Sequence, residues 1–237
     1  MTVDLRGVTT VLLPGTGSDD DYAYRVFSPA LHEVGAVVVT PRPQPARLVE
    51  GYRDALEEAA SAGPVAVGGV SIGAAVAVDW ALANPNAALA VLAALPAWSG
   101  SPVAAPAAMM ARYSAQVLRR DGLVAATSQM RASSPRWVGE ELTRSWVAQW
   151  PALPDAMDEA AAYVAPTCAQ LEMLSVPMGV AAATDDPVHP LEVGMEWVSA
   201  APCAALRTVT LDEMGAEPAV LGVACLAALA EAFDRLP

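Results

Sequence analysis

Short apolar runs alternate with longer helical patterns along most of this chain. The runs cover residues 8–13, 36–40, 64–68, 88–95, 178–183 and 206–211, and we expect each to form a strand. Helical segments separate them, as crossover connections between parallel strands require. The pattern therefore predicts the α/β class, with a mostly parallel sheet of about six strands flanked by helices.

The alternation stops between residues 98 and 165, where helical patterns occur without a convincing strand. We expect one helix from Ala105 to Arg120 and another starting at Ser134-Pro135, a good N-cap followed by a first-turn proline. We interpret residues 98–165 as a helical cap inserted after the fourth strand. Residues 1–97 and 166–237 then form the core, which ends in a helix from Pro218 to Leu236.

Composition narrows the possible partners and the compartment. The 237 residues suit a single domain, and a hydrophobic content of 54% excludes disorder. The net charge of −13 and the lack of a basic cluster argue against nucleic-acid binding. The spacing of the three cysteines, Cys168, Cys203 and Cys225, matches no metal knuckle, and we interpret them as reduced core thiols. Together with the lack of a signal-peptide pattern in the first seven residues, this predicts a cytoplasmic protein.

One uncharged stretch, residues 80–111, is long enough to be compared with a membrane span. Four prolines interrupt it, so it lacks the roughly 20 continuous apolar residues that a spanning helix needs. We expect buried structure there and no membrane span.

The clearest chemical motif is Gly69-Val70-Ser71-Ile72-Gly73, which lies between a buried strand and an apolar helix. This G-x-S-x-G sequence is typical of a tight strand-to-helix turn that presents a serine hydroxyl at the edge of a sheet. The helix N-terminus behind it favours developing negative charge. Ser71 is therefore the expected nucleophile.

A second motif, Thr184-Asp185-Asp186-Pro187-Val188-His189-Pro190, follows the fifth strand, where a catalytic acid is expected. Together with the Ser71 turn, it resembles the α/β-hydrolase family. The resemblance places the catalytic acid just before the first proline, at Asp186, and leaves Asp185 as a turn residue or N-cap.

The resemblance also implies a histidine after the last strand, just ahead of the closing helix. Ala216 occupies that position, so Ser71 is expected to lack its activating base. Two explanations stay open: an engineered His→Ala truncation and a naturally inactive homologue. The intact serine turn and acid loop favour truncation, because drift would erode them as well.

Neither of the two histidines in the chain is expected to replace the missing base. His32 falls near the end of the first helix, and we expect it to be structural. His189 is only three residues beyond Asp186, which is too close for that carboxylate to be expected to orient it in the usual way. We expect a polar residue at the rim of the site.

The loop Pro14-Gly15-Thr16-Gly17 follows the first strand, where the family places one donor of its oxyanion hole. By position the donor is the amide of Thr16, with that of Ile72 as the second. The loop lacks the G-x-x-x-x-G-K-S/T pattern of a nucleotide site.

The expected pocket is apolar, with Trp98 and Val188 in its wall and cap residues as its roof: Met109, Met110 and Trp146. These features predict a serine hydrolase that cleaves an apolar carboxylic ester or a related thioester or lactone, without a metal or organic cofactor. The alternative is a non-catalytic protein that binds a small molecule in the same pocket.

Overall fold

A single sheet of six parallel strands organises the computed structural model, which describes residues 4–235. Its strand order is β2-β1-β3-β4-β5-β6. The strands are β1 (Thr9–Leu13), β2 (Val37–Val39), β3 (Val65–Val70), β4 (Ala88–Ala94), β5 (Met178–Ala183) and β6 (Ala204–Val209). The predicted sheet of about six parallel strands is confirmed. The chain doubles back across the sheet after β2, so the loop after β1 and the turn after β3 lie on neighbouring strands.

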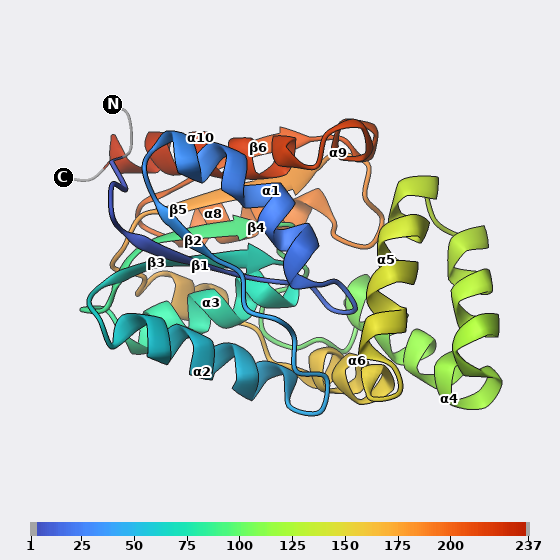
Figure 1. The fold of residues 1–237 in the computed structure, drawn as a ribbon. Coiled ribbons are helices and arrows are strands. Elements are labelled where there is room, and N and C mark those ends of the chain that lie inside the picture. Colours follow the sequence, from blue (N-terminus) through green and yellow to red (C-terminus); the bar gives the residue numbers. More distant parts are fainter. Residues whose placement is uncertain (1–3, 236–237) are drawn as a thin grey trace.

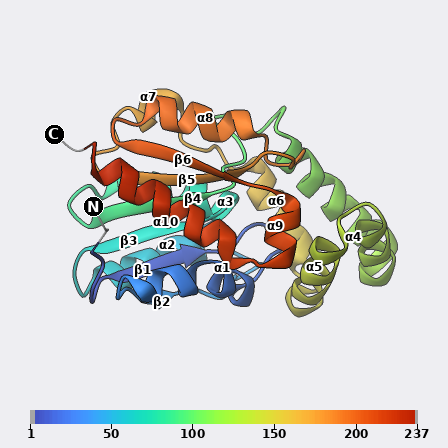
Figure 2. The same ribbon diagram turned by 90° about the horizontal axis from the view of Figure 1, so that it is seen from above.

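Helices cover both faces of the sheet (Figures 1 and 2). α1 (Asp20–Glu33) and α10 (Ala219–Phe233) pack on one face. The other face is covered by α2 (Leu48–Ala60), α3 (Ile72–Ala83), α7 (Cys168–Leu171) and α8 (Leu191–Ala200). Leu236, which we expected in the last helix, lies outside the described residues.

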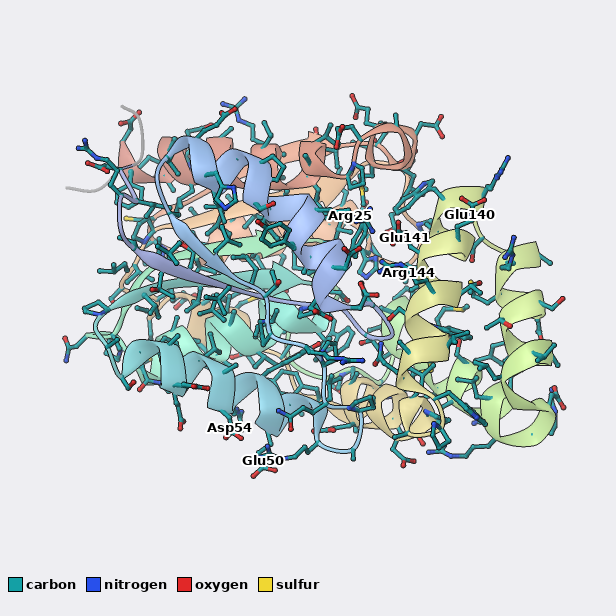
Figure 3. All side chains as sticks on the ribbon, in the orientation of Figure 1. Arg25, Glu50, Asp54, Glu140, Glu141 and Arg144 are labelled. Atoms are coloured by element: carbon teal, nitrogen blue, oxygen red, sulfur yellow. The ribbon has the colours of Figure 1, made fainter. Side chains whose placement is uncertain are left out.

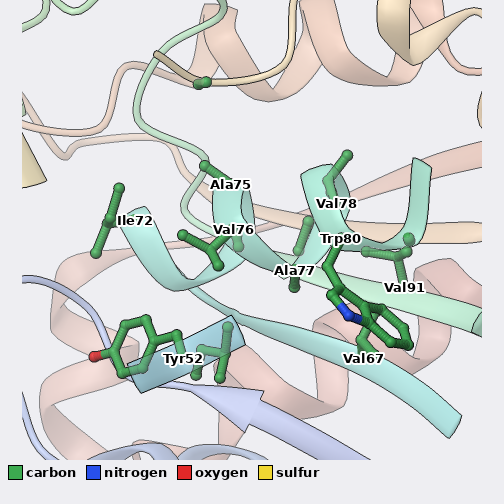
Figure 4. Close-up of a cluster of buried hydrophobic side chains, with 14 of the residues drawn as sticks. Tyr52, Val67, Ile72, Ala75, Val76, Ala77, Val78, Trp80 and Val91 are labelled. Carbon is green, nitrogen blue, oxygen red and sulfur yellow. The ribbon is translucent and has the colours of Figure 1, made fainter. Parts of the chain in front are cut away.

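The central strands are apolar on almost every side, because they are buried between the two helical layers. Most residues of α3, which lies in one of these layers, are buried as well. Every residue of β3 and of β5 is buried. Figure 4 shows the cluster in which α3 packs over β3 and β4, with Tyr52 of α2 beside Ile72 at the start of α3. This packing fixes α3, and with it the turn that carries Ser71, against the sheet.

In the connection from β4 to β5, α4 (Pro106–Ala132), α5 (Arg136–Gln149) and α6 (Leu153–Ala162) precede α7 and gather beyond one end of the sheet (Figures 1 and 2). α4 extends beyond the expected end near residue 121, but it has a non-helical break at Gly122, where φ is +78°. Apolar residues of the three helices form a cluster of their own that includes Trp146, Leu153 and Met157. Within residues 4–235, no helix is both long enough and apolar enough to cross a membrane.

Candidate active site

Ser71 occupies a strained turn between β3 and α3. Its backbone angles, φ 57° and ψ −116°, are unfavourable for a residue with a side chain. Two glycines make the turn possible. A Cβ atom at Gly73 would lie 2.8 Å from the carbonyl oxygen of Pro14 and closer still to that of Leu13, and Gly69 faces Leu13 in the same way. The turn therefore holds Ser71 directly beside the end of β1.

A histidine does contact Ser71, and it is His189. Its Nε2 atom lies 3.0 Å from Ser71 Oγ, and its Nδ1 atom lies 2.7 Å from Asp186 Oδ2. The expectation that Ser71 lacks a histidine partner is therefore wrong, as is the expectation that Asp186 cannot orient a residue three positions away. Serine, imidazole and carboxylate form one continuous hydrogen-bonded chain.

The geometry of the loop after β5 explains how so short a spacing works. Asp186 Oδ1 accepts a hydrogen bond of 2.8 Å from the amide of Val188, which bends the chain back over the carboxylate. Pro187 and Pro190 restrict the residues that precede them to extended conformations. The side chain of His189 can then reach the second oxygen of the same carboxylate.

Asp186 is partly buried and remains a carboxylate. Burial alone would raise the pKa of Asp186, but hydrogen bonds from His189 and from the backbone, with the nearby imidazole charge, hold that pKa below its ordinary value. Asp185, the other acid of the pair, turns away and accepts a hydrogen bond of 2.8 Å from the amide of Leu211. Asp186 therefore faces His189 and Asp185 faces the start of α9, while their separate roles stay a prediction.

The loop after β1 lies against the serine turn. A Cβ atom at Gly15 would lie 3.6 Å from Ser71 Cβ. A hydrogen bond of 3.0 Å from the Ser18 amide to the Gly15 carbonyl closes a turn around Thr16 and Gly17, whose φ of +71° suits glycine. The backbone amide of Thr16 takes no part in this hydrogen bond, which joins Ser18 to Gly15. The Ile72 amide, at the first position of α3, is among those with no partner inside the helix.

Two other positions were candidates for the catalytic base, Ala216 and His32. Neither residue contacts the hydrogen-bonded chain of Ser71, His189 and Asp186. Ala216 is the last residue of α9 (Leu211–Ala216) and is exposed. His32 is an exposed residue near the end of α1, where it makes an edge contact with Tyr24. Beside Ala216, Gly215 packs against α5, since a Cβ atom there would lie 2.7 Å from Trp137 Nε1.

The five residues predicted to line the pocket have different surroundings. Val188 is half-buried in the acid loop, and buried Trp98 donates a hydrogen bond to the Tyr163 carbonyl. Trp146 is buried and packs against Gly17. Met109 and Met110 are 57% and 47% exposed on α4, so they do not form a closed roof. Their role in binding stays a prediction.

The comparison with known proteins rests on structure alone. No family model and no curated protein matches the sequence. A carboxylesterase structure from the ammonia-oxidizing thaumarchaeon Nitrososphaera gargenis superposes with a TM-score of 0.73 at 14% identity, over 98% of this chain and 93% of that chain.

Two further solved structures are similar over most of their length. An esterase from Thermogutta terrifontis has a TM-score of 0.70 at 18% identity, covering 97% of this chain and 92% of that one. An enol-lactonase from Burkholderia xenovorans has a TM-score of 0.66 at 18% identity, with coverages of 87% and 84%. At such low identities the likeness concerns the fold. The chain therefore has the α/β-hydrolase fold.

Proposed function

We propose that this chain is a serine hydrolase that cleaves an apolar carboxylic ester, or a related thioester or lactone, with Ser71, His189 and Asp186 as its catalytic triad. The observation that carries the proposal is the position of His189, whose two ring nitrogens lie 3.0 Å from Ser71 Oγ and 2.7 Å from Asp186 Oδ2. This is the geometry that general-base activation of a serine requires.

In the proposed reaction, Ser71 Oγ attacks the acyl carbonyl carbon while His189 Nε2 takes the hydroxyl proton. Asp186 accepts the Nδ1–H hydrogen bond, which keeps Nε2 free to accept that proton, and it stabilises the imidazolium that results. The imidazolium then gives the proton to the leaving group, and the acyl group stays on Ser71. A water molecule, activated by the same imidazole, releases the acid and restores the serine.

The tetrahedral intermediate carries a negative charge on the former carbonyl oxygen. We assign its stabilisation to the amides of Thr16 and Ile72. The support is the contact of Gly15 with Ser71 and the location of Ile72 at the N-terminal end of α3. Loss of one such donor typically costs about 10²- to 10³-fold in kcat.

An apolar acyl group suits the surroundings of this loop. Trp146 and Met157 lie beside Gly17, and both belong to the apolar cluster formed by α4, α5 and α6. The net charge of −13 disfavours anionic substrates. Together these features favour an uncharged substrate with an apolar acyl chain.

The proposal is tested with p-nitrophenyl esters from acetate to decanoate. Wild-type protein should prefer the longer chains, and Ser71→Ala and His189→Ala should each lower kcat by at least about 10⁴-fold. His32→Ala is the matched control, because it removes the other histidine at an exposed position, and it should keep full activity. Folded wild-type protein that neither hydrolyses the series nor reacts at Ser71 with a fluorophosphonate would instead favour the non-catalytic binding protein.

A further inference from the structure

The C-terminal half of α5 contacts three successive residues of the loop after β1. Trp146 packs against Gly17, where a Cβ atom would lie 2.8 Å from the indole Nε1. Gln149 Nε2 donates a hydrogen bond of 2.8 Å to the Ser18 carbonyl, and Arg144 Nη1 lies 3.0 Å from Asp19 Oδ2. The cap thus holds the second half of the loop that carries Thr16.

The first half of this loop is held by the core instead. The buried hydroxyl of Tyr52 donates a hydrogen bond of 3.0 Å to the Pro14 carbonyl, and Gly15 packs beside Ser71. Thr16 lies between the two anchors, in the turn that the Ser18 amide closes. A shift of Ser18 therefore moves the backbone on which the Thr16 amide depends.

Further contacts restrain the side chains that join α5 to the loop after β1. Gln149 Nε2 is also 2.7 Å from the hydroxyl of buried Ser145, which fixes the amide group one helical turn away. Asp19 is both the N-cap of α1 and the partner of Arg144. Figure 3 shows Arg144, Glu141 and Arg25 gathered between α5 and α1, where Glu141 Oε2 lies 2.6 Å from Arg25 and 2.7 Å from Arg144.

We propose that Gln149 and Arg144 are positioning residues that set the Thr16 amide for the oxyanion. The inference rests on the proposed function and adds a second role for the cap, which would stabilise the transition state as well as bind substrate. A displacement of about 1 Å at a reacting centre can cost on the order of 10²-fold in rate. The effect should therefore appear in kcat more than in KM.

The test compares Gln149→Met and Arg144→Met with Arg136→Met. Arg136 is the matched control, because it lies on the same helix and pairs with Glu140 at the exposed surface. The first two variants should lower kcat by about 10-fold or more with KM nearly unchanged, while the control should match wild type. Arg144 is half exposed, so its variant keeps the measurement possible if Gln149→Met fails to fold.

A second readout separates positioning from a general loss of packing. A trifluoromethyl ketone with an apolar chain forms a tetrahedral adduct with Ser71 and places a negative oxygen at the Thr16 amide, whereas the product carboxylic acid forms no adduct. The two variants should bind the ketone at least 10-fold more weakly, by about 1.4 kcal/mol, and the acid as wild type does.

Equal losses for the ketone and the acid, or no loss for either, would overturn the positioning role and leave the proposed function intact. Full hydrolysis by Ser71→Ala would instead overturn the proposed function, and the positioning role with it. The two failures are therefore distinguishable in one set of variants.

Discussion

Replacing Asp186 with asparagine should inactivate the proposed triad while leaving the loop in place. Asp186 uses its two oxygens for different partners: Oδ1 accepts from the Val188 amide at 2.8 Å, and Oδ2 faces His189 Nδ1 at 2.7 Å. An asparagine has one oxygen and one NH₂ group, so it can satisfy only one of these acceptor positions.

The structure indicates which orientation the asparagine adopts. If its oxygen keeps the Val188 amide, its NH₂ group faces His189 Nδ1, which must then carry no proton. The ring proton moves to Nε2 and points at Ser71 Oγ, 3.0 Å away, so the imidazole cannot take the serine proton. The opposite orientation sets an NH₂ group against the Val188 amide, and an unsatisfied buried donor costs about 1–3 kcal/mol. The inactive tautomer is therefore favoured.

The expected loss follows from that tautomer. In a comparable Ser-His-Asp triad the same Asp→Asn change lowers kcat by about 10⁴-fold, or about 5.5 kcal/mol at 1.36 kcal/mol per factor of ten. The assay is kcat on p-nitrophenyl octanoate, with circular dichroism to check folding. Asp185→Asn is the matched control, since Asp185 bonds the Leu211 amide at the surface, and it should keep kcat. A kcat for Asp186→Asn within tenfold of wild type would refute the triad.

Three further outcomes are expected. Ala216→His should not raise ester hydrolysis, because His189 already contacts Ser71 Oγ; a gain of tenfold or more in kcat would contradict this assignment. Gly73→Ala should lower the free energy of unfolding by at least about 1–3 kcal/mol in urea titrations, because its Cβ would overlap the Leu13 and Pro14 carbonyls; unchanged stability would refute that overlap. The folded-state pKa of Asp186 is depressed, so its ionisation stabilises the fold above about pH 4, and this contribution is lost as the pH falls through the folded pKa. The Tm difference between wild type and Asp186→Asn should therefore shrink from pH 6 to pH 2. A constant Tm difference would exclude this contribution of Asp186 ionisation to stability.

The fold could be predicted from the sequence where local pattern and burial agree. All six strands were expected within two residues of their observed ends, because buried parallel strands are short, continuous apolar runs. The last strand was expected two residues too late, and α9 was missed. Thr210 and Glu213 form a capping box at the start of α9, so the T-x-x-E sequence there did contain the signal for a helix start.

The site was predicted only in part, because spacing along the chain is a poor measure of distance in a bent loop. Ser71 and Asp186 both form hydrogen bonds with the imidazole of His189, as their positions at the ends of β3 and β5 suggested. His189 was not expected to be the base because it follows Asp186 by only three residues, and the spacing does not reveal the turn that Asp186 Oδ1 forms with the Val188 amide. The signal was nonetheless present: of the two histidines, only His189 follows a strand at the edge where Ser71 lies.

In the proposed triad the base and the acid lie on the same loop, so fewer separate elements must be aligned by the fold. Asp186 and His189 are oriented within one short segment, so the remaining requirement is the 3.0 Å approach of His189 Nε2 to Ser71 Oγ. The end of α9 then needs no catalytic residue. Gly215, at this end, packs against Trp137 of α5. The case for a truncated histidine at Ala216 depended on a missing base, and His189 removes that premise. In the proposed enzyme, position 216 needs no histidine, and Ala216 is exposed at the end of α9 beside the contact of Gly215 with α5.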